Sequence, residues 1–258
     1  HVRSRRQRQM CIRDRDSLDK ISFNEIFSKK DDKCISNTQH SGKIQHLNNN
    51  IDDGLLFTTM SVPQLNNPDL DILSDDTVCG KILLIDENTS EFKNYAKGFR
   101  NITGLFSEKD LLIATSNGPM GGDEINKILP NENYGWPIAS YGDLYFRKND
   151  DKKVYYKKSH DKYGFKEPVF SFVPSIGISE IIKLSNNFSN FWEDNFLVAS
   201  LNKKTLYRIK FDKTHERIIF LEEIFIGDRI RDVLYLEESQ TILLSLELAG
   251  EILILNII

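Results

Sequence analysis

Residues 116–137, SNGPMGGDEINKILPNENYGWP, combine turn-forming residues with polar side chains whose types could do chemistry. Glycine tolerates positive φ and proline fixes its own φ, so the Gly-Pro, Gly-Gly and Asn-Tyr-Gly steps predict turns. A plain connector needs neither the acidic pair Asp123 and Glu124 nor the aromatic residues Tyr134 and Trp136. Long loops with an order of their own are more often functional than idle. The segment therefore predicts a functional loop, and a hairpin loop folded on itself is the alternative.

Short runs rich in β-branched and aromatic residues surround this segment, and turn residues bound them, so they predict strands. Their close spacing is typical of antiparallel meanders. Helix signals are few: one covers residues 17–27, and a turn is expected at 186–194. The predicted strands are 54–60, 81–86, 110–116, 169–173, 195–201, 205–211, 217–226, 232–238, 241–248 and 251–257.

A loose internal repeat favours an all-β fold of the β-propeller type. GKILLIDENTSE (80–91), TLYRIKFDKTHE (205–216) and GEILILN (250–256) are each a strand that ends in a turn with Asp or Asn. Repeated four-stranded antiparallel units indicate propeller blades, with a two-sheet sandwich as the alternative. The absence of helix-length amphipathic periods excludes a doubly wound α/β fold. In a propeller, loops at one end of the central channel converge on a site, and residues 116–137 are expected there.

The composition of the 258-residue chain, with 40% hydrophobic and 28% charged residues, is ordinary for a globular protein. No run of about 18 apolar residues occurs, so the sequence predicts no membrane span. The net charge of −4 and the lack of a basic stripe argue against nucleic acid as a partner.

The N-terminal segment HVRSRRQRQMCIRDR (1–15) is unlike the rest of the chain. A basic arm and a disordered tail are two interpretations. A third is favoured, because MCIRDR is what a common sequencing adapter gives when it is translated in one frame, and such a segment is excluded from fold reasoning. Its removal takes away six arginines and one aspartate and changes the net charge from −4 to −9. Residues 16–258 are then expected to form a single, partial domain that has lost its true N-terminus.

Cysteine usage leaves two alternatives. Cys11 falls in the N-terminal segment, and Cys34 and Cys79 lack the spacing of a metal site. Two unpaired core cysteines are the favoured interpretation. A single disulfide is expected instead if the protein is exported.

Four blocks occur in one order along the chain: GKILLIDENTSEFKNYAKGFRNITGL, SNGPMGGDEINKILPNENYGWPIASYG, EPVFSFVPSIGIS and GDRIRDV. Together they resemble the soluble quinoprotein sugar dehydrogenases, the glucose/sorbosone dehydrogenase family. The resemblance runs from about residue 35 to the C-terminus. It implies a six-bladed β-propeller, of which about four blades are present here. It also implies an enzyme that uses pyrroloquinoline quinone (PQQ) and Ca²⁺ to oxidise the anomeric carbon of aldoses to lactones.

The resemblance implies that His40 is the general base, because the family's base lies in a His-x-Gly motif before a strand and TQHSGKI matches it. A histidine suits the removal of a hydroxyl proton during hydride transfer, since its unperturbed pKa lies near working pH. Without the resemblance, His40 is one of five histidines, and a surface role is the simpler interpretation. Ile44 stands where the family often has arginine.

The resemblance also implies calcium ligands, and calcium takes oxygen ligands that include backbone carbonyls. The carbonyls of Gly118 and Pro119 match the pair that faces the catalytic calcium. Glu124 and Tyr134 match ligands of a second, structural calcium in some relatives. A turn-capping carboxylate is the alternative for Glu124. On the family interpretation, the glycines aim carbonyls at a cation and the acidic pair braces the loop.

Cofactor-binding residues follow from the three carboxylates of PQQ, for which arginine forks are the expected partners. The motif GDRIRDV places Arg229 and Arg231 two residues apart at a strand start, hence on one face. Arg100 and Asn101 match the family's Arg-Asn pair near cofactor and substrate, and Lys203 stands beside the position of a family lysine. Solvated surface arginines and a turn asparagine are the alternatives.

Several residues depart from the family pattern. Phe172 replaces a tryptophan, Val173 a polar residue and Asn202 a lysine. These departures motivate a second hypothesis, a binding module of the same descent. A calcium-dependent propeller hydrolase such as a lactonase is a third. The leading hypothesis implies a sugar substrate, an electron acceptor, and a periplasmic or secreted location, and the sequence leaves the sugar, the acceptor and the oligomeric state open.

Overall fold

The computed structural model of the chain describes residues 25–28, 42–61, 72–143 and 156–256. These ranges contain fifteen β-strands and one short 3-10 helix, η1 (Asp161–Tyr163). The all-β prediction is confirmed. Nowhere in these ranges does a helix reach the length and apolar character needed to cross a membrane.

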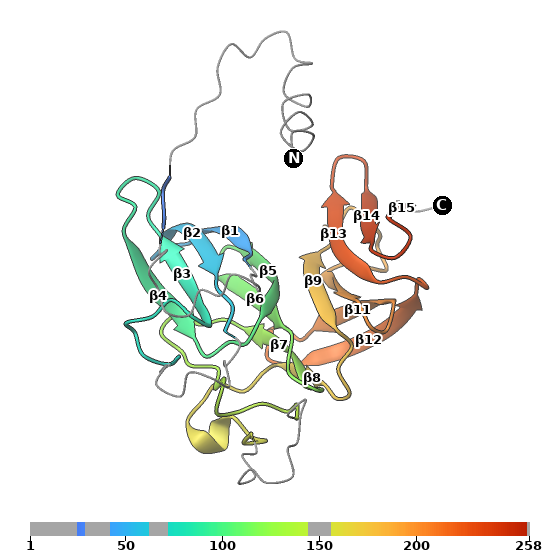
Figure 1. Cartoon of the computed structure of the whole chain (residues 1–258). Helices are drawn as coiled ribbons and strands as arrows, with labels where there is room; N and C mark the ends of the chain where they lie inside the picture. The colour runs from blue at the N-terminus through green and yellow to red at the C-terminus, as the bar shows by residue number, and fades with distance from the viewer. Residues whose placement is uncertain (1–24, 29–41, 62–71, 144–155, 257–258) are drawn as a thin grey trace, which may run out of the picture.

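The strands form four antiparallel sheets, which follow one another around an arc as propeller blades do (Figure 1). We call the sheets blades 1 to 4. Within each blade the strand order equals the chain order. Most of the connections are short turns, whereas long segments join β2 to β3 and β7 to β8. Blade 1 contains β1 (Ile44–Asn48), β2 (Asp53–Thr58), β3 (Lys81–Ile85) and β4 (Phe92–Lys97); blade 2 contains β5 (Ile102–Glu108), β6 (Leu111–Ser116), β7 (Asp123–Lys127) and β8 (Phe170–Phe172); blade 3 contains β9 (Ile178–Lys183), β10 (Asn195–Ser200), β11 (Thr205–Phe211) and β12 (Ile218–Phe225); blade 4 contains β13 (Ile230–Leu236), β14 (Thr241–Leu246) and β15 (Glu251–Leu255).

The hydrophobic cores lie between the blades. One cluster joins blades 1 and 2, a second joins blades 2 and 3, and a third joins blades 3 and 4. The middle strands β3 and β10 are buried along their whole length, which agrees with the apolar runs ILLI and FLVA that they contain. Blades 2 and 3 thus pack against a neighbouring blade on both faces, and this packing fixes the loops at the blade ends.

The first strands of successive blades contact one another, β1 with β5, β5 with β9 and β9 with β13, and so line the inside of the arc. Three charged residues from different blades meet there. Lys43, which precedes β1, pairs with Glu180 of β9, and its Nζ lies 3.9 Å from Asp232 Oδ1 of β13. The Glu180 side chain is 9% exposed. Burial raises the pKa of Glu180 to about 7 although Lys43 acts in the opposite direction.

All ten predicted strands are present, with ends that differ by at most two residues. The strands β1, β4, β5, β7 and β9 were not predicted. The expectation of a single loop over residues 116–137 is wrong in one respect, because β7 lies inside it and pairs with β6 and β8. Residues 186–194 form turns as predicted.

The predicted N-terminal helix and the predicted state of the cysteines differ from the structure. The helix predicted at 17–27 is wrong for residues 25–27, which are not helical, and its other residues lie outside the described ranges. The favoured interpretation of unpaired cysteines is wrong as well. Cys79 is fully buried and disulfide-bonded. Its partner lies outside the described residues.

Candidate functional site

A small cavity lies where the loop after β4 meets the loops that flank β7. We call it the cation cavity, for the chemistry argued below. Arg100, Glu124 and Trp136 contribute side chains to it. Its full lining is Gly98, Arg100, Ser116, Gly118, Pro119, Glu124, Tyr134, Trp136, Ala139 and Ser140. The structure therefore brings together four residues proposed as metal ligands and one proposed as cofactor-binding, although Arg100 comes from a different loop.

The Gly118 turn is shaped by backbone crowding. A Cβ atom added at Gly118 would lie 2.3 Å from the Gly122 carbonyl oxygen and 2.6 Å from that of Gly121. A Cβ added at Gly142 would lie 2.2 Å from the same Gly121 oxygen. Glycine is required at both places because backbone from two segments approaches closely. The glycines predicted as turn residues thus compact the loop behind the cavity.

Arg100 reaches the cavity from the loop between β4 and β5. Its Nη1 donates hydrogen bonds to the carbonyl oxygens of Asn117 (3.0 Å) and Gly118 (2.9 Å). The guanidinium carbon also lies 5.8 Å from the centroid of the Trp136 ring, a cation–π distance. The Trp136 ring is fixed in turn by a 3.0 Å hydrogen bond from its Nε1 to the Ser61 carbonyl. The Arg100 guanidinium therefore contacts the Gly118 carbonyl, which was proposed to face a calcium ion.

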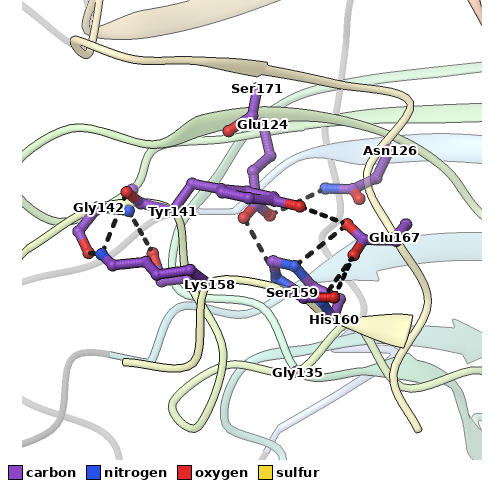
Figure 2. Close-up of polar contacts among 12 residues, drawn as sticks. Glu124, Asn126, Gly135, Tyr141, Gly142, Lys158, Ser159, His160, Glu167 and Ser171 are labelled. Atoms are coloured by element: carbon purple, nitrogen blue, oxygen red, sulfur yellow. Dashed lines mark hydrogen bonds and ion pairs between the residues drawn. The ribbon is translucent and has the colours of Figure 1, made fainter. Parts of the chain in front are cut away.

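Glu124 points into a buried polar cluster, shown in Figure 2. The His160 ring lies between two carboxylates: its Nε2 is 3.5 Å from Glu124 Oε1 and its Nδ1 is 3.5 Å from Glu167 Oε2. Tyr141 donates a 2.9 Å hydrogen bond to Glu167, and the backbone N–H of His160 donates to the same carboxylate at 2.7 Å. Glu167 thus orients the imidazole that faces Glu124.

Burial controls the charge of this cluster. The Glu124 side chain is 12% exposed, and desolvation raises its pKa to about 8. The hydrogen bond from Asn126 acts against this rise, and the nearby charge of Glu167 adds to it. His160 is fully buried, and desolvation lowers its pKa. At neutral pH neither partner therefore carries the charge that would compensate the other, and a bound cation would remove the cost of ionising Glu124.

Tyr134 lines the cavity, and its phenol hydroxyl makes two hydrogen bonds to the main chain. The hydroxyl donates to the Lys127 carbonyl at 2.7 Å and accepts from the Leu129 N–H at 2.9 Å, and the ring stacks on Phe99. The phenol is a structural element of the loop. Any ligand that Tyr134 supplies to a cation would come from its main-chain carbonyl.

Arg229 and Arg231 lie at the start of blade 4, outside the lining of the cation cavity. They reach the same carboxylate, as expected for residues on one face: Arg229 Nε donates to Glu247 Oε1 at 3.1 Å, and Arg231 Nη2 pairs with Glu247 Oε2. Desolvation acts to raise the pKa of Glu247, but the hydrogen bonds and charges of both arginines outweigh it and lower this pKa. Arg229 Nη1 also donates to Asn202 Oδ1 at 3.0 Å. The pair is thus preorganised by partners that sequence reasoning missed.

Of the remaining predicted residues, Lys203, Asn101 and Phe172 lie outside the cation cavity lining. Lys203 is exposed, and Asn101 has a buried side-chain oxygen that accepts no hydrogen bond within the described structure. His40 lies outside the described residues. Phe172 packs in the core between blades 2 and 3, 5.3 Å from the Tyr207 ring centroid, so this departure from the family pattern is a matter of packing.

Three functional residues were missed by sequence reasoning: His160, Glu167 and Glu247. No local signal marks them, since each depends on a contact between segments distant in sequence. Over the residues that the structure describes, no group of three or more His, Cys, Asp or Glu side chains is arranged to hold a metal ion. A cation here would depend on carbonyl oxygens and one carboxylate.

The sequence comparisons agree on one family. The model of the glucose/sorbosone dehydrogenase family matches residues 5–254. The chain is 28% identical over 173 residues to the aldose sugar dehydrogenase YliI of Escherichia coli (strain K12), covering 66% of this chain and 45% of that protein. It is 24% identical over 213 residues to quinoprotein glucose dehydrogenase B of Acinetobacter calcoaceticus, covering 61% and 43%. The chain spans less than half the length of these curated relatives.

Solved structures share the fold. The crystal structure of the soluble aldose sugar dehydrogenase from Escherichia coli in the apo-form aligns with a TM-score of 0.63 at 20% identity, covering 78% of this chain and 59% of that chain. The PQQ-bound form of the aldose sugar dehydrogenase from Streptomyces coelicolor aligns with a TM-score of 0.59 at 22% identity, covering 84% and 61%. The four blades described here are therefore blades of a β-propeller.

Proposed function

Because the chain belongs to the glucose/sorbosone dehydrogenase family, we propose that it is part of a PQQ- and calcium-dependent enzyme that oxidises the anomeric carbon of an aldose to a lactone. The observation that carries the proposal is the cation cavity. Gly118, Pro119, Glu124 and Tyr134 line it together with Arg100. The combination of carbonyl oxygens and a carboxylate is the donor set that calcium prefers.

The described residues fit a cation. Glu124 is a buried carboxylate without a compensating positive charge, and its raised pKa reports that lack. Calcium would be held by the Gly118 and Pro119 carbonyls, with Glu124 and the Tyr134 carbonyl as ligands of a second ion. Arg100 already uses one lone pair of the Gly118 carbonyl, and a carbonyl oxygen has two. The same carbonyl can therefore face both the guanidinium and a cation.

Arginine side chains would bind the cofactor. Arg229 and Arg231 would bind PQQ carboxylates, with Lys203 at the neighbouring loop and with Arg100 and Asn101 closer to the cavity. The free side-chain oxygen of Asn101 is suited to accept a hydrogen bond from a substrate hydroxyl. When bound, PQQ would supply the hydride acceptor and calcium would polarise the PQQ carbonyl. His40 would take the proton of the sugar hydroxyl.

The proposed location is the periplasm or the cell exterior. The disulfide of Cys79 supports it, since disulfides persist in oxidising compartments.

The test is a titration of PQQ into the metal-free chain, with and without calcium, followed by cofactor absorbance. Arg229→Gln is compared with Arg217→Gln, which changes an exposed arginine of blade 3. We expect calcium-dependent binding that weakens about tenfold in Arg229→Gln only, the loss of a charge-assisted contact. Reduction of a dye by one or more aldoses, abolished by His40→Ala with PQQ binding retained, would complete the evidence. Absence of micromolar PQQ binding in the unmodified chain would refute the proposal in favour of a binding module.

A further inference from the structure

Asp123 is a fully buried carboxylate at the start of β7, and the proposed function does not place it among the ligands of calcium or PQQ. It accepts four hydrogen bonds from backbone N–H groups. Oδ1 accepts from Gly118 at 3.0 Å. Oδ2 accepts from Ile176 at 3.0 Å, Gly177 at 2.7 Å and Ile178 at 3.0 Å. Hydrogen bonds to an ionised acceptor are stronger than neutral ones, so the carboxylate is a strong junction between segments.

The two oxygens of Asp123 serve different segments. Oδ1 holds the turn that carries Gly118, a residue that lines the cation cavity. Oδ2 holds the segment that leads from blade 2 into β9 of blade 3. The carboxylate therefore fixes the cavity loop against the neighbouring blade, and not only against its own strand.

The segment held by Oδ2 continues to the loop between β10 and β11. Leu201 N donates to the Gly177 carbonyl at 2.8 Å, and Asn202 N donates to the Ile176 carbonyl at 2.9 Å. Gly177 has φ +67°, and a Cβ added there would lie 2.9 Å from Asn202 Cγ. The approach is too close for any side chain, so the two loops form one rigid unit.

Asn202 then reaches the arginine pair. Its Oδ1 accepts the 3.0 Å hydrogen bond from Arg229 Nη1 across the boundary between blades 3 and 4. A continuous series of hydrogen bonds thus runs from the Gly118 turn through Asp123, the Gly177 segment and Asn202 to Arg229. It spans three blades and joins the proposed calcium-binding carbonyls to the proposed cofactor-binding arginines.

We propose that Asp123 is a positioning residue that sets the Gly118 carbonyl and the Arg229 guanidinium in one geometry and thereby couples calcium binding to PQQ binding. The inference rests on the proposed function and adds a residue and a mechanism of coupling to it. Asn202, which departs from the family pattern, is the link of this series to blade 4. Coupling of this kind is reciprocal, so calcium and PQQ raise each other's affinity by the same factor.

Asp123→Asn tests the proposal because the amide is isosteric but has a single acceptor oxygen. The three N–H donors around Oδ2 will keep that oxygen, and the amide nitrogen will then face the Gly118 N–H, donor against donor. Asn202→Ala tests the link to blade 4, since it removes the oxygen that accepts the hydrogen bond from Arg229 and leaves the Gly118 turn unchanged. Circular dichroism and urea unfolding establish that each variant is folded, calorimetry measures calcium affinity, and absorbance measures PQQ affinity.

We expect Asp123→Asn to lose about tenfold in calcium affinity measured without PQQ. Asn202→Ala is expected to bind calcium alone as the unmodified chain does and to lose about tenfold in PQQ affinity. In both variants the factor by which calcium raises PQQ affinity should be smaller than in the unmodified chain, because only the direct contact between calcium and PQQ would remain. A merely structural role would not change this factor. Unaltered coupling in a folded Asp123→Asn would overturn the proposal. If that variant does not fold, unaltered coupling in Asn202→Ala would do so. Failure of the unmodified chain to bind PQQ and calcium would instead overturn the proposed function and the coupling with it.

Discussion

The charged residues inside the arc give a prediction about pH. Glu180 is 9% exposed, and its pKa rises from 4.5 to about 7. Because the folded-state pKa lies above the unfolded value, the stabilising effect is complete below pH 4.5 and is lost as the pH rises through about 7. At 1.36 kcal/mol for each pKa unit, the loss amounts to about 3 kcal/mol.

The measurement is urea unfolding of the unmodified chain and Glu180→Gln between pH 4.5 and 8. Gln imitates the protonated carboxyl, so the free energy of unfolding of the unmodified chain should fall by about 3 kcal/mol relative to the variant over this range. Glu238→Gln, at an exposed glutamate of blade 4, should show no such trend. Burial raises the pKa of Glu180 by more than Lys43 lowers it, and Asp232 also raises it. A difference that grows in favour of the unmodified chain as the pH rises would show that the ion pair dominates, and would refute the prediction.

Three other changes should be informative. Gly118→Ala places a Cβ 2.3 Å from the Gly122 oxygen, so we expect a distorted turn, a lower melting temperature and at least about tenfold weaker calcium binding by calorimetry; a normal affinity would contradict the crowding argument. Leu197→Ala in the core of blade 3 should cost about 2–5 kcal/mol in urea unfolding, whereas Leu248→Ala at a 62% exposed site should cost under about 0.5 kcal/mol, and equal costs would contradict the assigned core. Reduction of the disulfide of Cys79 should lower the free energy of unfolding by about 2–4 kcal/mol, and titration of free thiols before and after reduction checks that the bond exists.

The strands that the sequence predicted are those rich in β-branched and other apolar residues, whether they are buried, as β3 is, or largely exposed, as β12 is. The run KILLI of β3 is buried on both faces and is easily found. The strand β7, with sequence DEINK, was missed because polar residues occupy its buried positions: Asp123 accepts hydrogen bonds from backbone N–H groups, and Asn126 is fully buried beside Glu124. Pattern reasoning treats such residues as loop residues. Tertiary structure overrides that preference here.

The candidate site likewise contains residues that the sequence could predict and residues that it could not. Residues of the 116–137 segment could be proposed from their types and motif, and they meet in one cavity. The partners that set their electrostatics could not, because His160 and Glu167 approach Glu124 from a separate loop. Glu247 likewise reaches Arg229 across the pairing of β13 with β14. Such contacts depend on blade geometry and register, which single-sequence patterns do not contain.

The position of Trp136 has a practical consequence for spectroscopy. The chain has only two tryptophans, and the other, Trp192, stacks against Arg208 at the outer side of blade 3. In a Trp192→Phe background, fluorescence would come from a single indole that lines the cation cavity and lies under the Arg100 guanidinium. Any ligand that draws Arg100 away from the ring or excludes water from the cavity would change the emission. The protein thus carries an intrinsic optical reporter at its candidate site, which needs no label.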